Sequence, residues 1–132
     1  MKKVFKNRLE RIGVAIVYLF GSRATGRAFP FSDVDIGIVL NDPGPEGDAR
    51  ILYQSLFELF SEAFPNAKLD IVFLQTAPLT VQYSAIKEGK ILFEKDPIFT
   101  ADYIYRVVNF YLDFKPVLDY FDRHSLQRHA EA

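Results

Sequence analysis

The chain contains no cysteine among its 132 residues. This absence excludes disulfide bridges, thiolate zinc sites and a cysteine nucleophile, although it leaves the cellular compartment open. A net positive charge is absent as well, because 16 basic residues are balanced by 17 acidic ones. Since no positive field is available to hold a polyanion through its phosphates, we expect no stable binding of nucleic acid.

Hydrophobic runs of membrane-spanning length are also missing. The apolar run from Val14 to Phe20 is far shorter than the roughly 20 residues that cross a bilayer. Lysines precede this run as in a signal peptide, but Arg8, Glu10 and Arg11 interrupt that likeness. We therefore predict a soluble, cytoplasmic protein with no membrane partner.

Apolar residues make up 49% of the chain, which is enough for one hydrophobic core and too little for two. We accordingly predict a single domain over residues 1–132. Its core is expected at about 14–94, and a helical C-terminal segment at about 97–124.

Hydrophobic periodicity predicts helices and strands in alternation. Helices are expected over 2–12 and 49–64, from about Thr76 and Pro78 to Gly89, and over the C-terminal segment; strands are expected over 14–20, 33–40, 68–74 and 90–94. This order predicts an α/β (α+β) fold in which about four strands form a small sheet flanked by helices.

The C-terminal helix has more apolar surface than one stripe. One predicted face holds Ile104, Val107, Val108, Tyr111, Leu112 and Leu118, and a second holds Phe110, Phe114, Val117 and Phe121. One apolar face can pack on the core of the domain, but the second needs another protein surface to cover it. We therefore expect an interface here, in a homodimer or a hetero-oligomer. Pro116 is expected to kink or split the helix, because it removes a backbone donor.

The stretch from Gly21 to Asp35 joins a strand end, a glycine turn and a pair of acids. Gly21 allows a sharp turn and a close approach to a ligand, and the Ser22 hydroxyl with nearby backbone amides suits the phosphates of a nucleoside triphosphate. Arg23 either contacts those phosphates or forms a surface ion pair. Ser32 is expected to orient the neighbouring carboxylates.

Asp33 and Asp35 should lie on one face of their strand, because strand side chains alternate with a period of two. Asp70 joins them if its strand is a neighbour; otherwise it faces solvent at a sheet edge. Three carboxylates could hold two Mg²⁺ ions, with Mn²⁺ as the alternative, one on the triphosphate and one at the attacking hydroxyl. Metal-dependent phosphoryl transfer is the chemistry that this pattern favours.

Gly21-Ser22, Ser32-Asp33-Val34-Asp35 and the later Asp70 together resemble the signature of the DNA polymerase β-like nucleotidyltransferase superfamily. The short chain and the run Gly-Ser-Arg-Ala-Thr-Gly resemble its minimal nucleotidyltransferases, and the resemblance extends from about Tyr18 to Glu94. It implies a polymerase β-like palm with a mixed sheet and a C-terminal helix. It also implies that the three aspartates are catalytic metal ligands and that Gly21, Ser22, Arg23 and Ser32 bind nucleotide.

Similar minimal nucleotidyltransferases act as antitoxins, transferring AMP from ATP to a tyrosine of a HEPN-domain toxin. The resemblance therefore implies a protein adenylyltransferase with ATP as substrate and a HEPN-domain toxin as partner. Two alternatives stay open: a small-molecule nucleotidyltransferase of the aminoglycoside-modifying type, and a non-catalytic subunit that masks its partner.

Overall fold

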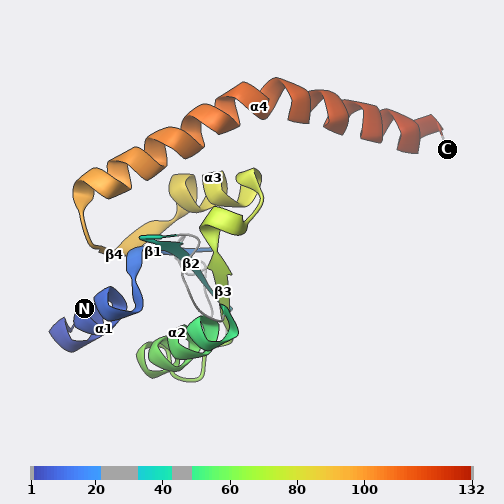
Figure 1. Cartoon of the computed structure of the whole chain (residues 1–132). Helices are drawn as coiled ribbons and strands as arrows, with labels where there is room; N and C mark the ends of the chain where they lie inside the picture. Colours follow the sequence, from blue (N-terminus) through green and yellow to red (C-terminus); the bar gives the residue numbers. More distant parts are fainter. Residues whose placement is uncertain (1, 22–32, 43–48, 132) are drawn as a thin grey trace.

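The computed structural model describes residues 2–21, 33–42 and 49–131, and the side chains among them up to Arg123. Along the chain it contains α1 (Lys3–Ile12), β1 (Val14–Phe20), β2 (Val34–Leu40), α2 (Ala49–Ala63), β3 (Leu69–Phe73), the 3-10 turn η1 (Leu74–Thr76), α3 (Leu79–Glu88), β4 (Lys90–Glu94) and α4 (Pro97–Glu131) (Figure 1). The expected alternation of helices and strands is confirmed. The organisation as one domain over 1–132 stays a prediction.

The four strands form one mixed sheet in the order β3-β2-β1-β4. β1 is antiparallel to both of its neighbours, β2 and β4, whereas β2 and β3 are parallel. The mixed α+β architecture that the resemblance implied is therefore confirmed. β4, which is distant from β1 in sequence, lies beside it in space.

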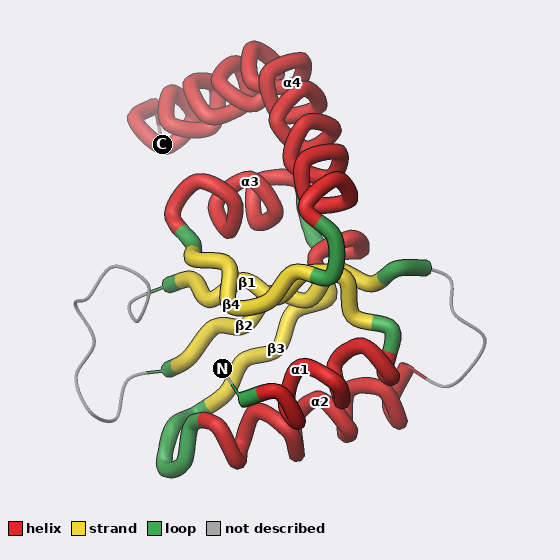
Figure 2. The backbone as a smooth tube through the Cα atoms, turned by 90° about the vertical axis from the view of Figure 1, so that its left-hand side faces the viewer, coloured by secondary structure: helices red, strands yellow, loops and turns green. Residues whose placement is uncertain are grey.

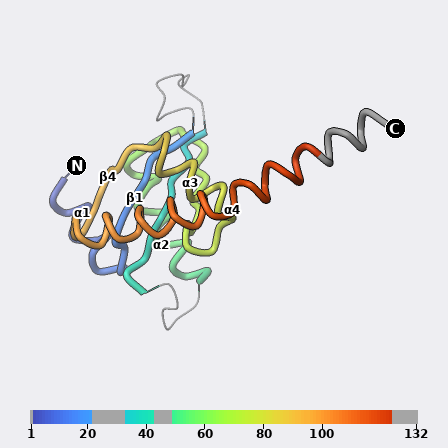
Figure 3. Tube along the Cα trace, turned by 90° about the horizontal axis from the view of Figure 1, so that it is seen from above, coloured from blue at the N-terminus to red at the C-terminus, as the bar shows by residue number. Residues whose placement is uncertain are grey.

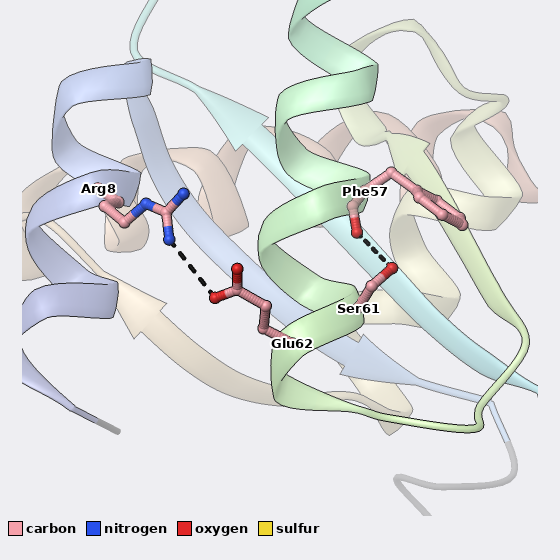
Figure 4. Close-up of polar contacts among 4 residues, drawn as sticks. All are labelled: Arg8, Phe57, Ser61 and Glu62. Carbon is pink, nitrogen blue, oxygen red and sulfur yellow. Dashed lines mark hydrogen bonds and ion pairs between the residues drawn. The ribbon is translucent and has the colours of Figure 1, made fainter.

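Helices α1 and α2 cover one face of the sheet (Figure 2). Leu9 of α1 and Leu56, Leu59 and Phe60 of α2 are fully buried there against alternate residues of β1 and β2. The Phe5 ring packs edge-on against Phe60, with centroids 5.4 Å apart. At the surface an exposed ion pair of 3.5 Å joins Arg8 to Glu62, so that α1 and α2 also meet outside the core (Figure 4).

Helices α3 and α4 cover the opposite face, where a second core cluster comprises Ala15, Ile16, Tyr18, Val39, Leu74, Ala85, Tyr103 and Val107. Ala15 and Ile16 share this face because the register of β1 is irregular between Val14 and Ile16. The rings of Tyr83 on α3 and Tyr111 on α4 stack with centroids 3.7 Å apart. Both faces of the sheet are thus covered by helices.

Helix α4 is a single helix of 35 residues that extends beyond the body of the protein (Figure 3). It runs through Pro116 without splitting, and its axis changes direction near its middle (Figure 1). The carbonyl of Leu112 loses its helical donor to the proline, but water can replace that donor because the residue is exposed. The helix also continues past residue 124, the expected end, to Glu131.

Two details of the predicted faces of α4 are corrected. Leu112, assigned to the first face, is 55% exposed, whereas Thr100 and Tyr103, which that assignment omitted, are buried. The second predicted face is exposed throughout. Within the described ranges, every helix is too short or too polar to span a lipid bilayer.

Candidate active site

Asp35 and Asp70 lie side by side at the first ends of two parallel strands. The register of β2 and β3 pairs these two residues directly, with Val34 opposite Leu69 before them. Direct pairing places both side chains on the same face of the sheet, the one that carries α3 and α4. The condition under which Asp70 joins the acidic pair, that its strand is a neighbour, is therefore met.

Asp33 stands one residue before β2 and is exposed, as is Asp70, whereas Asp35 is half-buried. Burial raises the pKa of Asp35 above its usual value, and the negative charges of Asp70 and then of Asp33 raise it further. A carboxylate feels its neighbours in this way only when they are close, because charge repulsion falls with distance and solvent screens it. The three predicted acids thus form one electrostatic cluster.

Gly21, which follows β1, lies directly against the Asp35 carboxylate. The last residue of that strand, Phe20, pairs with Asp35, and Gly21 then turns the chain with a φ of +78°. A Cβ atom at Gly21 would overlap Oδ2 of Asp35. Glycine is required here for two reasons, the left-handed backbone and the contact between backbone and carboxylate.

The turn between α3 and β4 lies at the same end of the sheet. Lys90 pairs with Leu19 of β1, and a Cβ atom on Gly89 would meet the Leu19 carbonyl oxygen at 3.1 Å. This helix-to-strand turn is part of the stretch that carries the family resemblance. Its nearness to Gly21 could not be read from residue types, because it follows from the pairing of β1 with β4.

Three of the predicted nucleotide-binding residues, Ser22, Arg23 and Ser32, fall outside the described residues. Their roles stay predictions. The described part of the site therefore consists of Gly21 and the three aspartates.

The donor set fits magnesium in its chemistry. Within the described ranges, no group of three or more histidine, cysteine, aspartate or glutamate side chains is arranged so that all of them could hold one metal ion. Magnesium does not need one, since it is usually bound by one or two carboxylates together with phosphate oxygens. A divalent cation beside Asp35 would also offset the repulsion that raises its pKa. Asp33, Asp35 and Asp70 are the residues that would hold it.

Comparison with known proteins was made for sequence and for structure. The family model described as "Polymerase beta, Nucleotidyltransferase" matches residues 1–98. A comparison with curated protein sequences finds no significant match.

Three solved structures resemble the whole chain. One is a toxin–antitoxin complex with AMP-PNP, at 20% identity over 96% of this chain and 98% of that one, with a TM-score of 0.66. A second is a toxin–antitoxin MntA complex in which two aspartates are replaced by glutamates, at 17% identity over 96% and 94%, with a TM-score of 0.67. The third, from Shewanella oneidensis, is a tri-AMPylated HEPN toxin bound to its MNT antitoxin, at 17% identity over 100% of both chains, with a TM-score of 0.62. At these identities the likeness establishes the fold.

Proposed function

The chain belongs to the polymerase β nucleotidyltransferase family, and on that premise we propose that it transfers AMP from ATP to a hydroxyl group of a protein. The observation that carries the proposal is the pairing of Asp35 with Asp70 on adjacent parallel strands. Together with Asp33 and the close packing of Gly21, it gathers acids from two separate strands at one end of the sheet. A structural role alone gives no reason to concentrate mutually repelling charges there.

Each residue has a distinct task in the proposed reaction. Asp33 and Asp35 would hold the divalent cation that accompanies the nucleotide, and Asp70 would help to hold a second cation beside the hydroxyl that attacks. Magnesium, when bound, supplies positive charge that neutralises the triphosphate and lowers the pKa of that hydroxyl. Gly21 keeps the backbone close to the Asp35 carboxylate, so that the phosphates are met by main-chain amides and not by a side chain.

The chemical balance of the transfer is simple. The attacking oxygen forms a bond to the α-phosphorus of ATP, and the bond from that phosphorus to the β-bridging oxygen breaks. The hydroxyl proton and pyrophosphate are released. Because charge, not covalency, dominates this step, positioning and electrostatic stabilisation supply the catalysis.

The proposed acceptor is a tyrosine of a HEPN-domain toxin, which makes the chain an antitoxin. One structural neighbour is a complex containing an AMPylated HEPN toxin, and another contains an ATP analogue. These facts concern those proteins, and they support the same partner and donor here.

The test uses ATP labelled at either the α- or the γ-phosphate, incubated with magnesium, the purified chain and lysate of the source cells. We expect one protein band to acquire α-label but no γ-label. The Asp33→Asn/Asp35→Asn double variant serves as the control and should transfer none. Label from the γ position would contradict adenylyl transfer.

The same double variant separates the alternatives. A subunit that only masks its partner would still neutralise the toxin after both aspartates are changed, whereas an adenylylating antitoxin would lose protection. A small-molecule transferase would label no macromolecule in the lysate, with the α-label recovered in a low-molecular-weight product.

A further inference from the structure

The turn between α3 and β4 contains a glycine that has no room for a side chain. The backbone N–H of Gly89 donates to the Ala85 carbonyl oxygen at 2.9 Å, which ends α3. A Cβ atom on Gly89 would overlap that same oxygen and would lie 3.1 Å from the Leu19 carbonyl oxygen of β1. The added atom would therefore meet the backbone of a helix and the backbone of a strand at once, and neither can give way as a flexible side chain would.

Space, and not backbone freedom, is the reason for this glycine. Gly89 has a φ of −82° and a ψ of 168°, an extended conformation that other residues adopt without strain. Gly13, which precedes β1 at its opposite end, is the reverse case: its φ is +94°, but its Cβ would have open space. The two glycines thus form a matched pair, one required by a close approach and the other by its backbone.

The end of β1 lies between this turn and the acidic site, because β1 is flanked by β4 on one side and β2 on the other (Figure 2). Phe20 pairs with Asp35 of β2, and Gly21 then brings its backbone against the Asp35 carboxylate. Leu19, whose carbonyl meets Gly89, is only two residues before Gly21. A displacement of β1 at Leu19 would therefore reach the contact between Gly21 and Asp35.

We propose that Gly89 is a positioning residue for the candidate site. By keeping the turn between α3 and β4 tight, it fixes the end of β1 where the Gly21 backbone meets the Asp35 carboxylate. It acts through Leu19 and not by contact with the reacting atoms. Its effect on activity rests on the proposed transfer of AMP, in which the main-chain amides after β1 and the Asp35 carboxylate must face the same triphosphate. The displacement of the backbone can be measured without any nucleotide.

The first experiment compares Gly89→Ala with Gly13→Ala in the transfer of α-label from ATP to the partner protein. Both variants are assayed at a temperature at which circular dichroism shows them fully folded, so that lost stability does not appear as lost activity. We expect Gly89→Ala to lose about 100-fold in rate, because small displacements of catalytic groups have effects of this size. Gly13→Ala should retain the wild-type rate. A folded Gly89→Ala variant with wild-type activity would overturn the proposal.

The second experiment records amide NMR spectra of the chain without metal or nucleotide. Gly89→Ala should shift the amide resonances of Gly21 and Asp35, whereas Gly13→Ala should leave both unchanged. In the reciprocal variant, Gly21→Ala, the Gly89 resonance should move, which keeps the test available if Gly89→Ala does not fold. Unmoved resonances in either variant would overturn the positioning role. A wild type that transfers no AMP would contradict the proposed function alone, and these shifts would still decide the role of Gly89.

Discussion

At the scale of single residues, the most informative group is the Asp35 carboxyl, whose pKa is raised by burial and by Asp70 and Asp33. A folded-state pKa above the ordinary 3.8 means that the folded protein holds this proton more tightly than the unfolded chain does. Stability therefore falls as pH rises from about 3.8 through the raised value, and the full cost is present at neutral pH. The charged Asp35 carboxylate therefore lowers the stability of the metal-free protein at neutral pH, and we expect a bound cation to reduce this cost.

We predict that Asp35→Asn raises the melting temperature of the metal-free protein at neutral pH, because it removes one of the three repelling charges. The difference from wild type should shrink as pH falls toward 3.8, where the carboxyl becomes neutral. The variant should also lose the stabilisation that magnesium plus ATP gives the wild type. Thermal melts with and without these ligands measure both effects, and an unchanged ligand response would remove Asp35 from the metal site.

Gly21→Ala tests the contact between the turn and the carboxylate. The added methyl group would overlap Oδ2 of Asp35, and the left-handed backbone would itself cost about 1 kcal/mol. We predict a loss of transfer activity of about 100-fold, because small displacements of a catalytic group have effects of this size. Gly13→Ala, with φ +94° but open space around its Cβ, is the control: it should lose stability and retain activity.

Two buried tyrosines, Tyr18 of β1 and Tyr103 of α4, are expected to respond differently to replacement by phenylalanine. The Tyr103 hydroxyl donates to Gln82 Oε1 at 2.8 Å, whereas the Tyr18 hydroxyl has no hydrogen-bond partner among the described residues. Tyr103→Phe should therefore cost about 0.5–1.5 kcal/mol of unfolding free energy, and Tyr18→Phe should be neutral or stabilising. Urea titrations at pH 7 give both values, and a clearly destabilised Tyr18→Phe variant would mean that its hydroxyl is satisfied.

Tyr18 also makes the stability of the protein depend on pH in alkaline solution. Burial and then Glu94 raise the pKa of Tyr18 to about 12. Because this exceeds the ordinary value of 10.0, the native state keeps the proton longer, and stability falls as pH rises from 10 toward 12. Tyr18→Phe should flatten that decline in melts between these pH values.

Part of the candidate site could be predicted from the sequence alone. Strand periodicity predicts that Asp33 and Asp35 lie on one face, and a glycine before them predicts a turn. The pairing of Asp70 with Asp35 needed the strand order, which no local pattern contains. The buried hydroxyl of Tyr18 depends on tertiary packing, which the sequence pattern does not contain.

At the scale of elements, the end of β2 depends on a side chain from η1. Gln75 accepts from the Leu40 backbone N–H at 2.7 Å and donates to the Leu40 carbonyl at 2.9 Å, as a neighbouring strand would. We predict that Gln75→Ala destabilises the protein by about 1–3 kcal/mol, because both backbone groups lose their partner. Thr76→Ala, which removes an exposed 3.2 Å hydrogen bond to Phe73, should have little effect. Chemical denaturation compares the two.

The ends of helices and strands were predicted accurately where a residue that interrupts regular structure, such as glycine, lies at the boundary. Strands 14–20 and 90–94 were predicted at their observed limits, since glycine precedes each of them. The helix expected from about Thr76 instead begins at Leu79, because Leu74–Thr76 form a 3-10 turn that positions Gln75. The length of α4 was underestimated because the residues after 124 are mostly polar, yet the helix continues to Glu131. Pro116 does not split the helix, because exposure makes its missing hydrogen bond tolerable.

At the scale of the whole molecule, the acidic site and the exposed apolar side chains of α4 are separate features. The acids lie at the first ends of β2 and β3, whereas Phe110, Phe114, Val117 and Phe121 are exposed on the later part of α4. Variants of one should leave the other unaffected, since distant sites without shared partners behave additively.

The most direct measurement of the central claim is the intact mass of a purified HEPN-domain toxin from the same cells, after incubation with the chain, magnesium and ATP. We predict a mass increase of one or more AMP groups on the toxin, located to a tyrosine by fragmentation. The increase should be absent with Asp33→Asn/Asp35→Asn or after chelation of the metal. An unmodified toxin that the double variant still neutralises would contradict catalysis and leave masking as the function.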